Sequence, residues 1–165
     1  SSGRLFFPKT GSVMAILPSA SPNKKNGKNI STSFLRLDWT KNREIAGMAV
    51  RDCSLHAGIL GEMAQKIDSA RAFTMQVASM AGNEGLYGRI GEPFMLSKCS
   101  AAKAYVCDVS IWVAHKAMEL MGSYGYCADY NVEKYLRDVK ILQLWLGGPQ
   151  RALLDAALGY YKFEW

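Results

Sequence analysis

Two long runs of apolar and small residues at helical spacing constrain this chain more than any other feature. In each run the residues recur at alternating steps of three and four, which places them on one face of a helix. The first run comprises His56, Leu60, Met63, Ile67, Ala70, Thr74 and Val77, and the second comprises Met95, Cys99, Ala102, Val106, Val109, Val113, Ala117 and Leu120. Gly82, Gly85 and Gly88 separate the runs, and Pro93 suits the first turn of a helix. We predict two long helices joined by a glycine-rich loop, the second ending near Met121.

The composition fits one helical domain with a charged N-terminal segment. A chain of 165 residues with 49% hydrophobic content can bury one core. No apolar run reaches the roughly 18 residues of a membrane span, so we expect a soluble protein. Residues 1–43 contain eight Lys or Arg and one acidic residue, Asp38, which gives them +7, and residues 44–165 therefore sum to −1.

The first 43 residues differ from the rest in pattern as well as in charge. They lack helical periodicity, contain three prolines and have no acidic residue before Asp38. A basic, serine-containing segment is typical of a mitochondrial leader or its remnant. The alternative is a tail that orders only on a partner surface. We predict an extended basic arm at residues 1–43 and a helical domain at residues 44–165, in a protein located in the mitochondrion or otherwise in the cytoplasm.

The cysteines and histidines do not predict a metal site. The four cysteines are Cys53, Cys99, Cys107 and Cys127. They form no Cys-x-x-Cys pair, and Cys53 with His56 supplies only half of a tetrahedral site. We interpret the cysteines as buried free thiols, which suit a reducing compartment. His56 and His115 are isolated in sequence, so we expect packing or surface roles for them.

Glycines mark the predicted ends of helices in the last third of the chain. The turn Gly122-Ser123-Tyr124-Gly125-Tyr126 ends the second long helix. A charged helix follows at residues 132–141, in which Glu133 can pair with Arg137 at i,i+4. The break Gly147-Gly148-Pro149 precedes a last helix whose predicted apolar face is Leu153, Leu154, Ala157 and Leu158.

The order and spacing of these segments resemble a known family. The run MGSYGYCADYNVEKYLRDVKI, followed by LWLGG, is similar to the C-terminal domain of the acyl-CoA dehydrogenases. Residues 60–71 also resemble the second long helix of that domain, and the resemblance covers about residues 55–163. It implies an all-α helical bundle. We therefore predict an all-α fold that carries an extended N-terminal arm.

The resemblance also implies a place for a cofactor. In the family, the glycine turn and a preceding glutamine approach an FAD that is held mainly by a neighbouring subunit. The corresponding positions, by resemblance alone, are Glu119, Gly122, Ser123, Gly125, Gly147 and Gly148. Glu119 replaces the glutamine and places a negative charge toward a diphosphate, and Ser123 replaces a glycine. We expect these positions to be vestigial and no cofactor to bind, unless a partner chain completes an FAD site.

The family's catalytic residue is missing at its usual position. A glutamate takes a proton from the carbon next to the substrate thioester, and its position in this sequence is Leu146. Leucine accepts no proton, and loss of a general base typically costs about 10²–10⁴-fold in rate. Some family members place the glutamate on another helix. Glu44 and Asp52 are the candidates for that role here, and we expect neither to fill it.

Three functions follow from these observations. The sequence contains no counterpart of the family's N-terminal helical domain or middle β-domain. We therefore expect a non-catalytic scaffold or accessory subunit that assembles with other protein subunits as a homo- or hetero-oligomer. The first alternative is a fragment or small subunit of an FAD-dependent acyl-CoA dehydrogenase whose partner supplies the flavin site and the base. A further alternative is nucleic-acid binding through the basic arm, which strong salt dependence would reveal.

Overall fold

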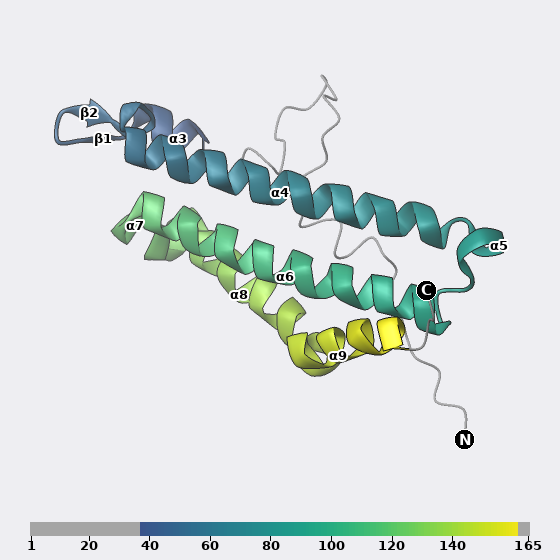
Figure 1. Ribbon diagram of the computed structural model, residues 1–165. Coiled ribbons are helices and arrows are strands. Elements are labelled where there is room, and N and C mark those ends of the chain that lie inside the picture. Colours follow the sequence, from purple (N-terminus) through teal and green to yellow (C-terminus); the bar gives the residue numbers. More distant parts are fainter. Residues whose placement is uncertain (1–36, 162–165) are drawn as a thin grey trace, which may run out of the picture.

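The chain folds into long helices that pack side by side (Figure 1). The computed structural model describes residues 37–161. The two longest helices, α4 (Ser54–Ala81) and α6 (Pro93–Met121), run antiparallel, and the short helix α5 (Glu84–Tyr87) lies in their connection. The predicted pair of long helices is thereby confirmed, and α6 ends at the predicted residue.

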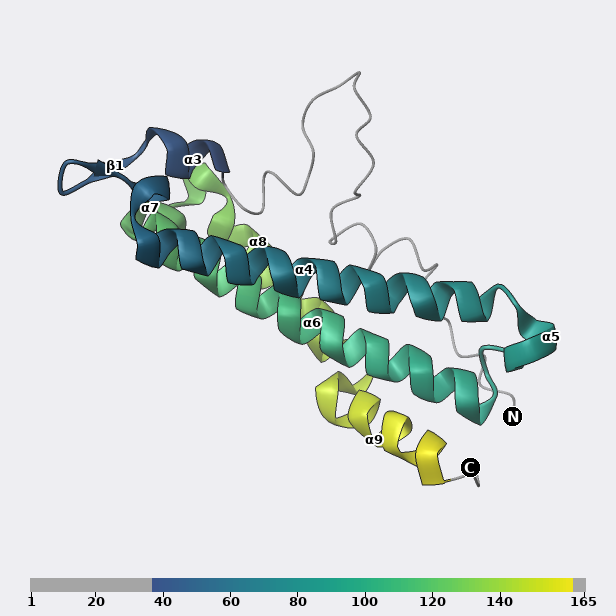
Figure 2. The ribbon, with the colours of Figure 1, turned by 45° about the horizontal axis from the view of Figure 1, so that its top comes forward.

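Helix α6 is the centre of the fold. On one side it packs against α4, and on the other it packs against α8 (Val132–Leu144) and α9 (Gly148–Tyr161). Figure 2 shows the same order of α4, α6 and α9 from a second direction. The described residues contain only two strands, β1 (Glu44–Ile45) and β2 (Met48–Ala49), which form a small antiparallel hairpin. The predicted all-α class is therefore confirmed.

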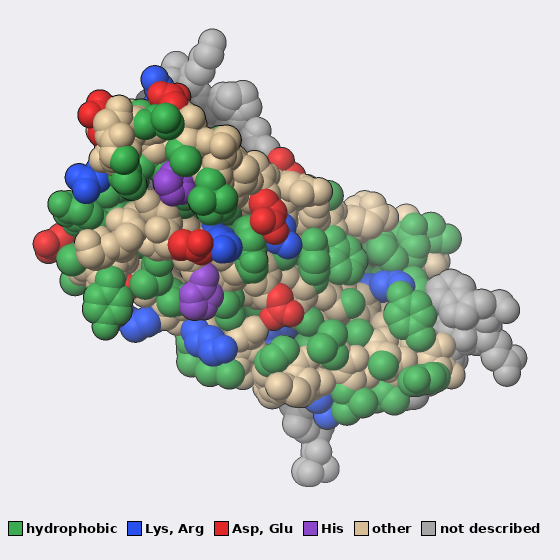
Figure 3. Space-filling model, turned by 60° about the vertical axis from the view of Figure 1, so that its left-hand side comes forward, with side chains coloured by type: hydrophobic (Ala, Val, Ile, Leu, Met, Phe, Trp, Pro, Cys, Tyr) green, Lys and Arg blue, Asp and Glu red, His purple; other side chains and the backbone are tan. Residues whose placement is uncertain are grey.

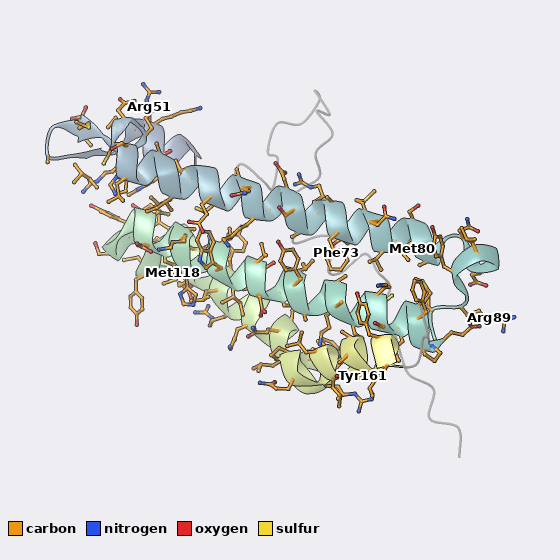
Figure 4. All side chains as sticks on the ribbon, viewed as in Figure 1. Arg51, Phe73, Met80, Arg89, Met118 and Tyr161 are labelled. Carbon is orange, nitrogen blue, oxygen red and sulfur yellow. The ribbon has the colours of Figure 1, made fainter. Side chains whose placement is uncertain are left out.

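The two predicted apolar stripes meet in the core. Buried side chains of α4, α6 and α8 form one cluster, which includes Met63, Ile67, Ala70, Val106, Val109, Val113, Val132 and Val139. Phe73 points from α4 toward α6 (Figure 4), where its ring centroid lies 6.0 Å from that of Tyr105. Burying a large aliphatic side chain stabilises a fold by about 1.5–3 kcal/mol, so this cluster is the main source of stability.

A short helix and a hairpin lead into α4. They are α3 (Leu37–Asn42), the hairpin β1–β2, and the 3-10 turn η1 (Val50–Asp52). The predicted basic arm mostly lies outside the described residues, but residues 37–42 of that range are helical. The predicted helical domain begins at residue 44, whereas α4 itself begins at Ser54. A six-residue helix is too short to show a 3.6-residue period, which is why the sequence pattern did not indicate α3.

Helix α9 turns a different face toward α6 than its large residues suggested. Its buried residues are Gly148, Ala152 and Gly159, while Leu153 and Leu154 are exposed. The Ser97 hydroxyl of α6 donates a hydrogen bond of 2.8 Å to the carbonyl of Ala156, and a Cβ at position 159 would overlap the Ser97 side chain. The close approach of the two backbones admits only small residues between them. The predicted apolar face therefore points away from α6.

Candidate functional site

The family positions fall into two separate places in the structure. The glycine turn lies at the end of α6 and forms helix α7 (Ser123–Tyr126), while Leu146 lies in the 3-10 turn η3 (Trp145–Gly147) between α8 and α9. The Lys103 ammonium of α6 donates to the Trp145 carbonyl, which fixes this corner along α6. From Lys103 to Gly122, at about 1.5 Å per residue, is roughly 28 Å. Within one chain the turn and the corner therefore do not form a common site.

The glycine turn is held by its own backbone. Gly122 adopts φ 59 and ends α6, and its N–H donates to the Glu119 carbonyl at 3.2 Å. The Gly125 N–H donates to the Gly122 carbonyl at 3.0 Å. A Cβ at Gly125 would lie 2.9 Å from the backbone of Met118, a residue that Figure 4 shows near the end of α6. Chain geometry alone thus requires glycine at these two positions.

The side chains around this turn do not fit an FAD diphosphate. The Glu119 carboxylate is exposed and pairs with the Lys116 ammonium at 2.6 Å, so the nearby cation already has a partner. The Gly122 and Gly125 amides are committed to bonds within the turn. Ser123 is exposed, and its carbonyl accepts a hydrogen bond from the Cys127 thiol at 3.4 Å. Because Glu119 neutralises Lys116, residues 116–126 offer a diphosphate no uncompensated positive charge.

An aromatic cluster ties the turn to the start of the described chain. The Trp39 ring of α3 lies 5.1 Å from Tyr124 and 5.5 Å from Tyr130, centroid to centroid. The Arg43 guanidinium lies 5.3 Å from the centroid of the Tyr124 ring. Sequence reasoning did not indicate this cluster, because Trp39 and Arg43 lie more than 80 residues before Tyr124 and Tyr130 in the chain. The segment before α4 therefore covers part of the glycine turn.

The corner between α8 and α9 carries a leucine at the position that resembles the family's glutamate. Leu146 adopts φ 57 and ψ 41 and is 48% exposed. Gly147 and Gly148 follow with φ 86 and φ 72. A left-handed conformation costs a residue with a Cβ about 1–2 kcal/mol, so the corner holds Leu146 in a backbone geometry that leucine rarely adopts.

The other carboxylates considered as a base lie elsewhere. Glu44 is exposed in the hairpin, and the exposed Asp52 pairs with Arg51 at 3.3 Å in η1. Both precede α4, at the end of the bundle opposite α5 (Figure 1). The Gln143 amide of α8 donates to the exposed Asp108 carboxylate of α6 at 2.8 Å. Glu44 and Asp52 thus lie in the segment before α4 and not at the corner.

The thiols and imidazoles form no further site within residues 37–161. All four cysteines are free, but only Cys107 is buried, and Cys127 is exposed, so the prediction that all are buried is wrong. Position 127 follows the turn, where the chain lies at the surface. Burial raises the pKa of the Cys99 and Cys107 thiols, which keeps them protonated and unreactive. His56 is half-buried and His115 is exposed. Over the same range, no three or more metal-binding side chains come together.

The part of the chain that the structure describes also lacks a helix able to cross a membrane.

Comparisons with known proteins agree with the fold. Residues 34–157 match the profile described as "Acyl-CoA dehydrogenase, C-terminal domain". The chain is 31% identical over 122 residues to the "Probable acyl-CoA dehydrogenase FadE25" of Mycobacterium tuberculosis, which covers 73% of this chain and 30% of that protein. It is 32% identical over 114 residues to an acyl-CoA dehydrogenase of Bacillus subtilis, with 67% of this chain and 27% of that protein covered. The chain thus spans about 30% of the length of these relatives.

Solved structures share the arrangement of helices. Butyryl-CoA dehydrogenase from Megasphaera elsdenii superposes with a TM-score of 0.69 at 24% identity, over 80% of this chain and 33% of that one. Acyl-CoA dehydrogenase from Geobacillus kaustophilus gives a TM-score of 0.66 at 25% identity, over 78% of this chain and 31% of that one. The similarity lies in the helical domain described above.

Proposed function

This chain belongs to the acyl-CoA dehydrogenase family through its C-terminal domain, and we propose that it acts as a non-catalytic scaffold or accessory subunit of a larger assembly. The observation that carries the proposal is Leu146. It occupies the position that resembles the family's glutamate, in an exposed corner, and its side chain accepts no proton. Proton removal next to a thioester requires a positioned base, and without one the rate falls by about 10²–10⁴-fold.

The glycine turn supports the same proposal. Its two glycines are explained by a helix end and by a close backbone approach, and the amides of these two glycines donate to backbone carbonyls. Glu119 and Lys116 neutralise one another instead of meeting a ligand. The turn therefore has the function of connecting α6 to α8, and it needs no cofactor to explain its sequence.

The surface of the bundle supports a role in assembly. Large apolar side chains are exposed along the end of α8, the following corner and α9, among them Leu144, Trp145, Leu146, Leu153 and Leu154. Figure 3 shows hydrophobic side chains exposed between the charged groups over one face. Exposed apolar surface of this kind is typical of proteins that bind other subunits. A mitochondrial location would fit the basic composition of residues 1–43.

The second candidate is a subunit of an FAD-dependent acyl-CoA dehydrogenase in which a partner chain supplies the flavin site and the base. Family membership favours it, because members of this family use FAD. In that arrangement the turn of one chain would lie against a flavin held by another. The two candidates differ in whether a flavin and a substrate-dependent reaction exist in the complex that contains this chain.

A pair of substitutions at the corner separates the candidates. Leu146→Glu restores the family's carboxylate, and Leu146→Gln is the uncharged control of the same size. Each variant is expressed in the complex, and reduction of an electron-acceptor dye by a panel of acyl-CoA thioesters is measured. We expect no turnover from the wild type or from either variant. Turnover by the wild type would support the second candidate, in which a partner supplies both the flavin site and the base. If Leu146→Glu alone gains turnover, a flavin site is present in the complex but no partner supplies the base.

A further inference from the structure

We draw no further inference here: the strongest candidate, the surface cluster in which the Arg43 guanidinium lies over the Tyr124 ring of α7 next to the exposed Tyr126, belongs to the glycine-turn site already described.

Discussion

Substituting the glycine at the α6–α9 contact tests the packing of the bundle most sharply. Gly159 is buried in α9, and a Cβ there would overlap Ser97 of α6 and lie 3.4 Å from the Pro93 carbonyl. Gly159→Ala therefore forces α9 away from α6, at a cost of about 1–3 kcal/mol for overpacking. The shift also strains the bond from the buried Ser97 hydroxyl to the Ala156 carbonyl, which contributes about 0.5–1.5 kcal/mol. The higher helix propensity of alanine offsets about 1 kcal/mol of this destabilisation.

The sign of the effect is therefore diagnostic. We expect Gly159→Ala to lower the free energy of unfolding by about 1–3 kcal/mol, measured by urea denaturation at one fixed protein concentration. Gly61→Ala is the control, because Gly61 is exposed in α4 and a methyl group added to its Cα would have nothing within 4 Å. That variant should be more stable by about 0.5–1 kcal/mol. Ser97→Gly should partly rescue Gly159→Ala. If Gly159→Ala is as stabilising as the control, the close approach of α6 and α9 does not exist.

Three further predictions concern the turn, the thiols and the aromatic cluster. Gly125→Ala should destabilise the chain by about 1–3 kcal/mol in the same urea assay, because the new Cβ meets backbone that cannot move aside; no loss would mean that the turn is looser than described. Maleimide at mildly alkaline pH should label the exposed Cys127 well before the buried Cys107 in a mass-spectrometric time course. Burial raises the pKa of Cys107, so the protonated thiol stabilises the fold below the ordinary pKa of a thiol, and this stabilisation is lost as the pH rises through the raised value. If Cys107→Ser left the pH dependence of the free energy of unfolding unchanged, this account of the thiol would be contradicted. Trp39→Ala should lower the free energy of unfolding by about 1–3 kcal/mol, because two ring contacts are lost, and should speed amide hydrogen exchange around Tyr124. Unchanged exchange would show that the aromatic cluster does not stabilise the glycine turn.

The core could be predicted from the sequence because its signal is local. Met63, Ile67 and Ala70 repeat with the helical period, and the structure buries all three against α6. The ion pair between Glu133 and Arg137 was predictable for the same reason, since residues four apart on a helix lie side by side. Both predictions needed only residues within one helix.

The orientation of α9 could not be predicted in this way. The large side chains of Leu153 and Leu154 suggested that these residues pack against the bundle. The contact between α9 and α6 is instead set by Gly159 and Ser97, which are 62 residues apart. The position of α3 depends similarly on contacts of Trp39 with residues beyond the end of α6. Such contacts between distant segments override the local pattern and leave no periodic trace in the sequence.

The resemblance indicated individual residues of the candidate site but not their arrangement. The resemblance indicated Gly122, Gly125 and Leu146, and the structure explains the two glycines by turn geometry and close packing. The resemblance did not indicate that the corner is fixed at Lys103, roughly 28 Å along α6 from the turn. That distance follows from how α8 and α9 fold back along α6, which depends on the whole bundle.

The ratio of flavin to chain in the native complex tests the central claim most directly. The complex that contains this chain is purified, its flavin is extracted and counted against the chain, and its visible absorption is followed on addition of acyl-CoA thioesters. A non-catalytic subunit predicts a stoichiometric chain, no flavin and no bleaching. One flavin for each chain or each pair of chains, bleached by an acyl-CoA, would contradict that account and assign the base to a partner.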